Sequence, residues 1–314
     1  MIVAPSATTA AASRRRLPVG EEIFLDHVGH FVRDAQAARR ALQRAGFAPT
    51  PVSIQSDKDS STERLVPTGL GNSTAMFARG YLEVLFKNSD TPLVREFDAA
   101  LARRAGLHLA AFSVADAAAA RERLAGAGFA VRDLVRMQRP VETEGGPGTA
   151  AFTIARVKPM TMPEGRIQML THHTEDTVWQ PRWLSHPNSV CDLIDVVIAV
   201  DDLDEAAARF ARFTGRSAIS TPGGALIRLD RGGVYLISHD RAAEKLPEVP
   251  VTALPFMLGY ALGVESLAAA EAAVDGADLE WRAFEEGIVA TFPTELGEGA
   301  WFFVERPEGL PWRR

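Results

Sequence analysis

The chain has 314 residues, of which 46% are hydrophobic and 24% are charged, and this length suits about two globular domains at roughly 100–200 residues each. Its formal net charge is −6, with acidic and basic residues interspersed, which disfavours nucleic acid as a main partner. The single cysteine, Cys191, excludes an internal disulfide and a thiolate metal cluster, and it fits a reducing, cytoplasmic location.

The first 20 residues are rich in Ala, Ser, Thr and Arg, and the run Arg14-Arg15-Arg16 is not followed by an apolar segment long enough for a secretion signal. We therefore expect residues 1–20 to form a disordered tail. No run of about 18 apolar residues follows, so no membrane span is expected either.

A repeating unit begins after this tail. Residues 25–32 are apolar and partly β-branched, as in a strand. Asp34 is a plausible N-cap, and Gly46, twelve residues later, is a plausible helix terminator. Three candidate strands follow, at 50–55, 73–77 and 81–86. The pattern predicts a βαβββ unit.

The same pattern recurs along the chain. Residues 106–114 form a second opening strand, and again twelve residues separate the helix cap Asp116 from Gly128. The closing segments 80–85 and 165–170 also match. A third unit opens at 193–200, with a helix from Asp202 or Asp204 to Gly215, and a shorter fourth unit opens at 258–264, with a helix over about 266–274. Such a repeat implies four copies of one structural unit.

Four units predict two pairs, each curling into one open mixed sheet with helices outside, which is an α+β fold. We expect residues 21–178 to form the first domain, 179–190 a connecting loop and 191–314 a second domain. The connecting segment contains Pro181, Pro187 and Asn188, which are residues typical of loops.

The repeat also places metal-capable side chains at matching positions. His27 and Glu83 lie on strands of the first unit, and His108 and Gln168 lie at the corresponding places of the second. Pairing of the two units would bring the four together in one concave sheet, where they suit Zn, Ni, Mn or Fe. A single His on an apolar strand is more often a packed structural residue, so the prediction rests on the joint placement.

These features resemble the vicinal-oxygen-chelate superfamily, which includes glyoxalase I, bleomycin-resistance proteins and extradiol dioxygenases. The segments 72–83, 171–179 and 186–188 more narrowly resemble the glyoxalase-like domain family. The resemblance implies a small-molecule substrate that chelates the metal through two adjacent oxygens. We expect a monomer or homodimer, because two pairs of units in one chain already supply the partner that a single pair would need. Asn72, His172, His173 and His186 are the candidate substrate-binding residues, although both histidine segments also suit strand ends and loop turns.

The resemblance to glyoxalase I implies a His or Gln, Glu, His, Glu ligand pattern, which here reads His27, Glu83, His108, Gln168. An amide cannot take up a proton, so Glu83 is the candidate base of a lyase or isomerase reaction. The alternatives are an Fe(II) dioxygenase with two His and one carboxylate as ligands, and a metal-free binder of the bleomycin-resistance type. The second domain offers Asp195, Gly259, Leu236 and Phe302 at the corresponding places, so it is expected to be degenerate and to hold no metal.

Overall fold

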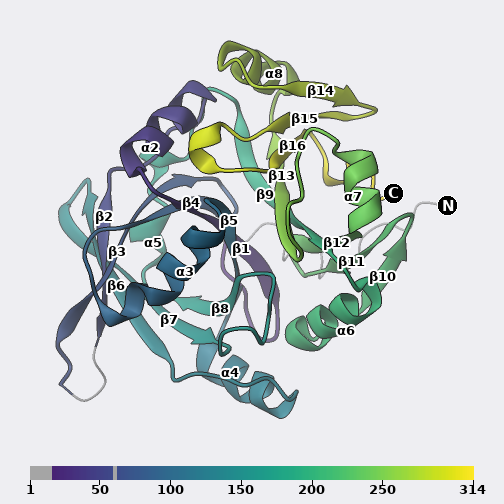
Figure 1. Ribbon diagram of the computed structural model, residues 1–314. Coiled ribbons are helices and arrows are strands. Elements are labelled where there is room, and N and C mark those ends of the chain that lie inside the picture. The colour runs from purple at the N-terminus through teal and green to yellow at the C-terminus, as the bar shows by residue number, and fades with distance from the viewer. Residues whose placement is uncertain (1–15, 59–61) are drawn as a thin grey trace.

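The computed structural model describes residues 16–58 and 62–314 (Figure 1). Four βαβββ units follow one another, as the repeat predicts. The first comprises β1 (Ile23–Val32), α2 (Ala35–Arg44), β2 (Ser53–Lys58), β3 (Leu65–Met76) and β4 (Tyr81–Lys87). The second comprises β5 (Gly106–Val114), α4 (Ala117–Gly126), β6 (Val135–Thr143), β7 (Gly146–Arg156) and β8 (Arg166–His172).

The third and fourth units build the second sheet. The third comprises β9 (Val190–Val200), α6 (Leu203–Thr214), β10 (Ala218–Thr221), β11 (Gly224–Arg228) and β12 (Gly233–Ser238). The fourth comprises β13 (Phe256–Val264), α8 (Leu267–Gly276), β14 (Trp281–Phe284), β15 (Gly287–Thr291) and β16 (Ala300–Val304). Connecting helices are α3 (Arg95–Arg103), α5 (Glu175–Val178), α7 (His239–Lys245) and the 3₁₀ turns η1 (Pro92–Val94), η2 (Pro181–Trp183), η3 (Thr294–Leu296) and η4 (Pro307–Gly309).

Local sequence explains the helix ends. The Asp34 side chain accepts hydrogen bonds from the backbone N–H groups of Gln36 and Ala37, and Asp116 caps α4 in the same way. Gly46 and Gly128 follow these helices with φ angles of 77° and 84°, where a residue with a side chain would be strained. The twelve-residue spacing from cap to glycine therefore defines the helix of each of the first two units.

The first sheet differs from the expectation of an open sheet. Its strands close into a barrel in the order β1-β4-β3-β2-β6-β7-β8-β5. Closure occurs where β2 pairs with β6, through Ser56 opposite Gln138 and Asp57 opposite Met137. The second sheet stays open, with the four-residue strands β10 and β14 at its two edges.

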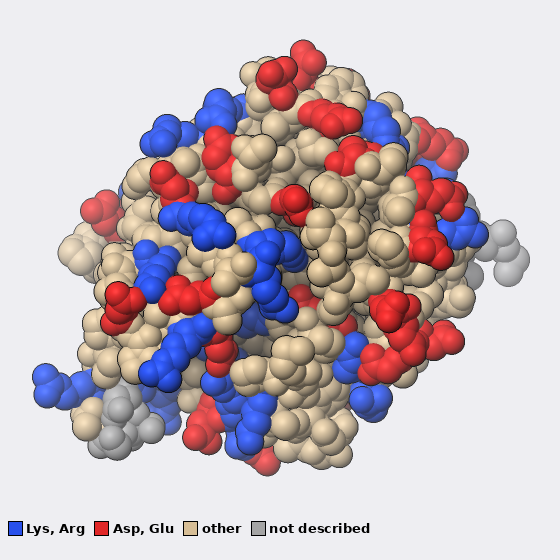
Figure 2. Space-filling view, in the orientation of Figure 1, with Lys and Arg blue, Asp and Glu red and all other residues tan. Residues whose placement is uncertain are grey.

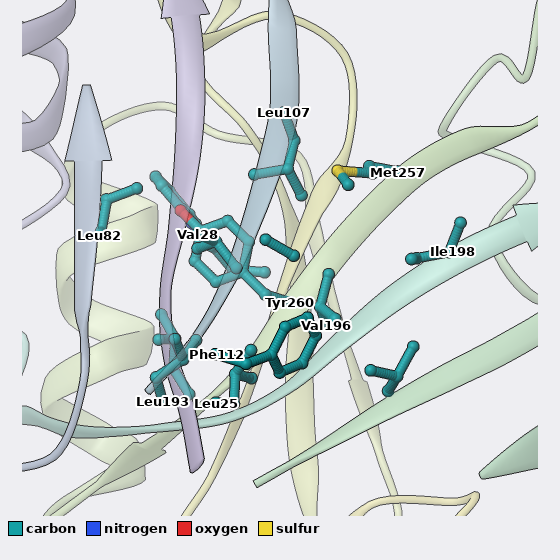
Figure 3. Close-up of a cluster of buried hydrophobic side chains, with 14 of the residues drawn as sticks. Leu25, Val28, Leu82, Leu107, Phe112, Leu193, Val196, Ile198, Met257 and Tyr260 are labelled. Carbon is teal, nitrogen blue, oxygen red and sulfur yellow. The ribbon is translucent and has the colours of Figure 1, made fainter. Parts of the chain in front are cut away.

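The two sheets pack against each other through one hydrophobic core. Side chains on the outer faces of β1, β4 and β5 meet side chains of β9 and β13, and Figure 3 shows part of this cluster. Leu25, Val28 and Phe112 lie on the barrel side, facing Val196 and Tyr260 of the second sheet. The opposite faces of the barrel strands point inward, where a separate cluster of buried hydrophobic side chains packs around the candidate site.

Most of the predicted tail, residues 1–15, lies outside the described residues. Within residues 16–20, the carbonyl of Arg16 accepts a hydrogen bond of 2.8 Å from Arg231. The predicted connecting loop contains η2, and its Asn188 donates a hydrogen bond to the carbonyl of Ala45. Among the described residues, no helix has the length and apolarity needed to cross a membrane.

Candidate active site inside the barrel

The barrel encloses a small cavity of about 20 Å³, which we call the barrel cavity. Three of the four predicted metal ligands, His27, Glu83 and Gln168, line it. The other lining residues are Gln55, Asn72, Tyr81, Leu85, Leu109, Met137, Arg139, Phe152, Ile154, Arg156, Arg166 and Leu170. The cavity has room for about one water-sized group.

His27 and Glu83 lie face to face on the adjacent parallel strands β1 and β4. His27 Nε2 lies 3.7 Å from Glu83 Oε2, and only 5% of the surface of each residue is exposed. A buried carboxylate beside an imidazole is costly unless both are held by hydrogen bonds. The surrounding contacts of each group supply these bonds.

Asp26 holds the ring of His27. The Asp26 carboxylate accepts a hydrogen bond of 2.7 Å from His27 Nδ1 and another of 2.8 Å from His172 Nε2. Burial opposes ionisation of Asp26, but His172 and His27 hold its pKa well below its usual range. Because Nδ1 carries the bonded proton, Nε2 is the ring atom left to face Glu83. The His27 ring also stacks on Tyr81, with centroids 4.4 Å apart.

Two amides hold Glu83. Its Oε1 atom accepts hydrogen bonds from Asn72 Nδ2 at 2.5 Å and from Gln55 Nε2 at 3.2 Å. The Oδ1 atom of Asn72 is buried and has no hydrogen-bond partner. A buried acceptor without a partner costs free energy, so this oxygen is available to a bound group. Asn72 was predicted to be near the substrate, whereas Gln55 carried no motif that could have singled it out.

Gln168 occupies the position in the second unit that Glu83 occupies in the first. Glu83 lies opposite Gly29, and Gln168 lies opposite Ala111, in the same register of the two parallel pairs. The Oε1 atom of Gln168 accepts a hydrogen bond of 2.9 Å from Arg156 Nε. The carbonyl oxygen that would bind a metal is therefore already bonded to an arginine.

His108 lies apart from these three residues. Its strand has a bulge between the pairs Gly29–Leu109 and His30–Leu107, and the residue that matches His27 in register is Leu109. His108 Nε2 donates to the backbone carbonyl of Arg104 at 3.0 Å. Burial and the nearby Arg104 lower the pKa of His108 to about 3. His108 is the extra residue of this bulge, as Asp26 is in β1, so it corresponds to Asp26 and not to His27, and it does not line the barrel cavity.

The other predicted histidines have separate environments. His172 is buried and bonds Asp26, which makes it a support for His27. His173 is exposed and its Nε2 lies 2.7 Å from Thr153 Oγ1. Both ring nitrogens of His186 are bonded to backbone atoms, of Ala48 and Met76. Asp26 was missed from the sequence, although it directly precedes His27.

These contacts bear on whether the site suits the metal that the resemblance implies. Within residues 16–58 and 62–314, no three His, Cys, Asp or Glu side chains form a group that could hold a metal ion. Three guanidinium groups, from Arg139, Arg156 and Arg166, also line the barrel cavity and would repel a cation. The residues present therefore do not fit the expected four-ligand site.

Two larger pockets adjoin the barrel cavity. One, of about 450 Å³, lies beside η2 and shares Arg139 with the cavity; we call it the η2 pocket. The other, of about 290 Å³, lies beside α3 and shares Arg156 and Arg166 with the cavity; we call it the α3 pocket. His108 lines the α3 pocket. Each pocket thus shares part of its wall with the cavity that holds His27 and Glu83.

The second sheet has a different interior. Asp195 is fully buried and accepts hydrogen bonds from Trp312 and Arg313. Tyr235 lies opposite Val197, as Glu83 lies opposite Gly29, so Tyr235 and not the predicted Leu236 corresponds to Glu83. Leu236 packs in the core between the sheets. Phe302 lines the concave side. The positions that correspond to His27 and Glu83 thus carry an ion-paired carboxylate and a phenol.

A family model described as a glyoxalase-like domain matches residues 25–214. The chain belongs to the glyoxalase-like domain family. The match extends beyond the barrel into the third unit, farther than the segments that suggested the resemblance. No curated protein sequence matches the chain.

Solved structures share the fold. A hypothetical protein from Staphylococcus aureus superposes with a TM-score of 0.60 at 9% identity, over 90% of this chain and 98% of the other. A mutant of 4-hydroxymandelate synthase from Streptomyces coelicolor gives 0.54 at 13% identity, over 90% and 92%. A fusion protein of a xylose isomerase-like TIM barrel and 4-hydroxyphenylpyruvate dioxygenase gives 0.52 at 12% identity, over 92% of this chain and 49% of the other. At these identities the likeness concerns the fold alone.

Proposed function

We propose that the barrel cavity is the active site of an enzyme of lyase or isomerase type, which moves a proton on a small molecule carrying two adjacent oxygen atoms. The observation that carries this proposal is the buried contact between His27 Nε2 and Glu83 Oε2, at 3.7 Å. A carboxylate and an imidazole held in one cavity are the usual groups for general acid–base catalysis.

Each group has a role that its contacts support. Glu83 is the base, because Asn72 and Gln55 bond its Oε1 atom and leave Oε2 facing His27. The Asp26 carboxylate orients His27 and would stabilise the imidazolium if the ring takes up a proton. The unpaired Oδ1 of Asn72 would accept a hydrogen bond from a substrate hydroxyl. No step in this scheme passes through a metal.

Hydrogen exchange with solvent tests the proposal. Incubating the protein in D₂O with 2-hydroxy ketones, 2-oxo acids and 2-hydroxy acids, and following C–H exchange by NMR, should identify compounds whose protons are moved. Glu83→Gln keeps the size of the side chain and removes the base, so exchange should slow by about 10²- to 10⁴-fold. His239→Gln, at an exposed histidine of α7, is the matched control. Equal exchange in wild type and Glu83→Gln, or none with any compound, would contradict the proposal.

Metal dependence stays a prediction of the family resemblance and has its own test. Elemental analysis and thermal melting in excess Zn, Ni, Mn or Fe(II) can be compared between wild type and His27→Ala. Metal-dependent stabilisation that is lost in His27→Ala would support a divalent cofactor. Oxygen uptake by the iron-loaded protein would favour the dioxygenase alternative.

A further inference from the structure

The barrel cavity is too small to hold a whole substrate. Its volume of about 20 Å³ suits a single water-sized group, so only the reacting end of a molecule fits beside His27 and Glu83. The rest must occupy an adjoining pocket. The chemistry of that pocket then limits what kind of molecule the enzyme accepts.

The α3 pocket is strongly basic. Five cationic side chains line it together with a single carboxylate, that of Glu96, which amounts to a formal charge of +4. The cations are Arg103, Arg132, Arg156, Lys158 and Arg166. His108 adds no charge near neutral pH, because burial and Arg104 lower its pKa to about 3. On a chain whose net charge is −6, such a concentration of positive charge attracts anions.

Little in the protein neutralises these cations. Glu96 pairs with Arg132 at 2.7 Å. Arg166 is half-buried and, within the described part of the chain, its side chain makes no hydrogen bond or ion pair; it lies over the ring of Phe31, 5.1 Å from the centroid. Burial and the neighbouring Arg166 and Arg132 lower the pKa of Arg156 to about 9. A bound anion would offset both the burial and the mutual repulsion.

The pocket is open to solvent and shares part of its wall with the barrel cavity. Figure 2 shows Lys and Arg side chains gathered around a hollow on the face that carries α3 and β8 in Figure 1. Arg156 and Arg166 line both this pocket and the barrel cavity, and Arg156 bonds Gln168. In contrast, the η2 pocket has two arginines and one glutamate among mainly apolar or neutral polar residues.

We propose that the α3 pocket binds a carboxylate or phosphate group of the substrate, held by Arg166 and Arg156, while the reacting end enters the barrel cavity. Arginine binds such oxyanions with two parallel hydrogen bonds. The substrate class is therefore a small anionic molecule with adjacent oxygens at its other end. This inference rests on the proposed function of the barrel cavity.

Titration with simple anions tests it. Inorganic phosphate and malonate are titrated by calorimetry, at constant ionic strength, into wild type and four variants. These are Arg166→Gln, Arg103→Gln, Arg40→Gln and, in the η2 pocket, Arg182→Gln. Loss of one charged contact should weaken binding about 10- to 100-fold in Arg166→Gln and several-fold in Arg103→Gln, which lies at the exposed rim. Arg40→Gln removes the same charge from the exposed face of α2 and should bind like wild type. The stronger of the two ligands indicates whether the natural group is a phosphate or a carboxylate.

Two outcomes would overturn the inference: equal affinities in Arg166→Gln and Arg40→Gln, or a loss of binding confined to Arg182→Gln in the η2 pocket. Circular dichroism shows whether Arg166→Gln is folded, and Arg103→Gln provides the answer if it is not. The exchange assay on wild type separates this inference from the proposed function, and Glu83→Gln should still bind the anions because Glu83 does not line the α3 pocket. Wild type that binds the anions but moves no proton on any compound would support the pocket and reject the proton transfer.

Discussion

The Asp26 carboxylate offers the sharpest test of how the site is built. It is fully buried and is bonded by His27 and His172 at 2.7 and 2.8 Å. Asp26→Asn preserves the shape but replaces one acceptor oxygen with an NH₂ donor, so one of the two rings must lose its hydrogen bond or move its proton to the other ring nitrogen. Each hydrogen bond to a charged group contributes about 1.5–3 kcal/mol.

The free energy of unfolding of Asp26→Asn should therefore fall by about 3–5 kcal/mol, as when one member of a buried charged pair is removed. Urea unfolding followed by circular dichroism measures this change. The matched control is Asp133→Asn, at a side chain that is fully exposed, and its effect should stay within about 0.5 kcal/mol. Nitrogen chemical shifts should also show that the His27 ring no longer keeps its proton on Nδ1.

If Asp26→Asn unfolds at the same urea concentration as Asp133→Asn, Asp26 is not an ionised acceptor for both rings. The orientation of His27 would then have to come from its stacking on Tyr81 alone. If Asp26→Asn is as stable as wild type but exchanges substrate hydrogen more slowly, Asp26 affects catalysis without supporting the fold. This outcome would refute the stabilising role that we infer from its two buried hydrogen bonds.

Two further predictions concern the contact between the sheets. Tyr260→Phe removes the hydroxyl that lies 3.1 Å from His30 Nε2 and 2.6 Å from Trp301 Nε1. The free energy of unfolding, measured by thermal or urea unfolding, should therefore fall by about 1–3 kcal/mol. An unchanged midpoint would mean that water replaces this hydroxyl. Burial lowers the pKa of His30 to about 4. Below pH 6.5 the unfolded chain therefore binds a proton that the folded chain does not. The free energy of unfolding should fall by about 3 kcal/mol as the pH drops from 6.5 to 4. Urea midpoints measured across this range should vary less in His30→Gln than in wild type, and equal slopes would contradict this assignment.

The repeat made much of the fold predictable. Asp34 and Asp116 bind the N–H groups of their own helices, and a glycine ends each helix, so these elements depend on residues close together in the chain. The order of strands within each unit follows from the same local signals. Helix α3 was not expected, because no cap or repeat marked residues 95–103, although its Phe97 packs on Phe31 at the end of the barrel.

The four units, the family and the matching positions of Glu83 and Gln168 can be read from the amino-acid sequence alone. The folded structure shows that β2 meets β6 to close the barrel, and that His108 corresponds to Asp26 and not to His27 and lines the α3 pocket. It also decided that Asp26 and His172, far apart in the chain, hold one ring, and that Arg156 and Arg166 converge on one pocket. Local patterns record spacing along a strand, whereas side chains meet through strand pairing and register, which depend on the whole sheet.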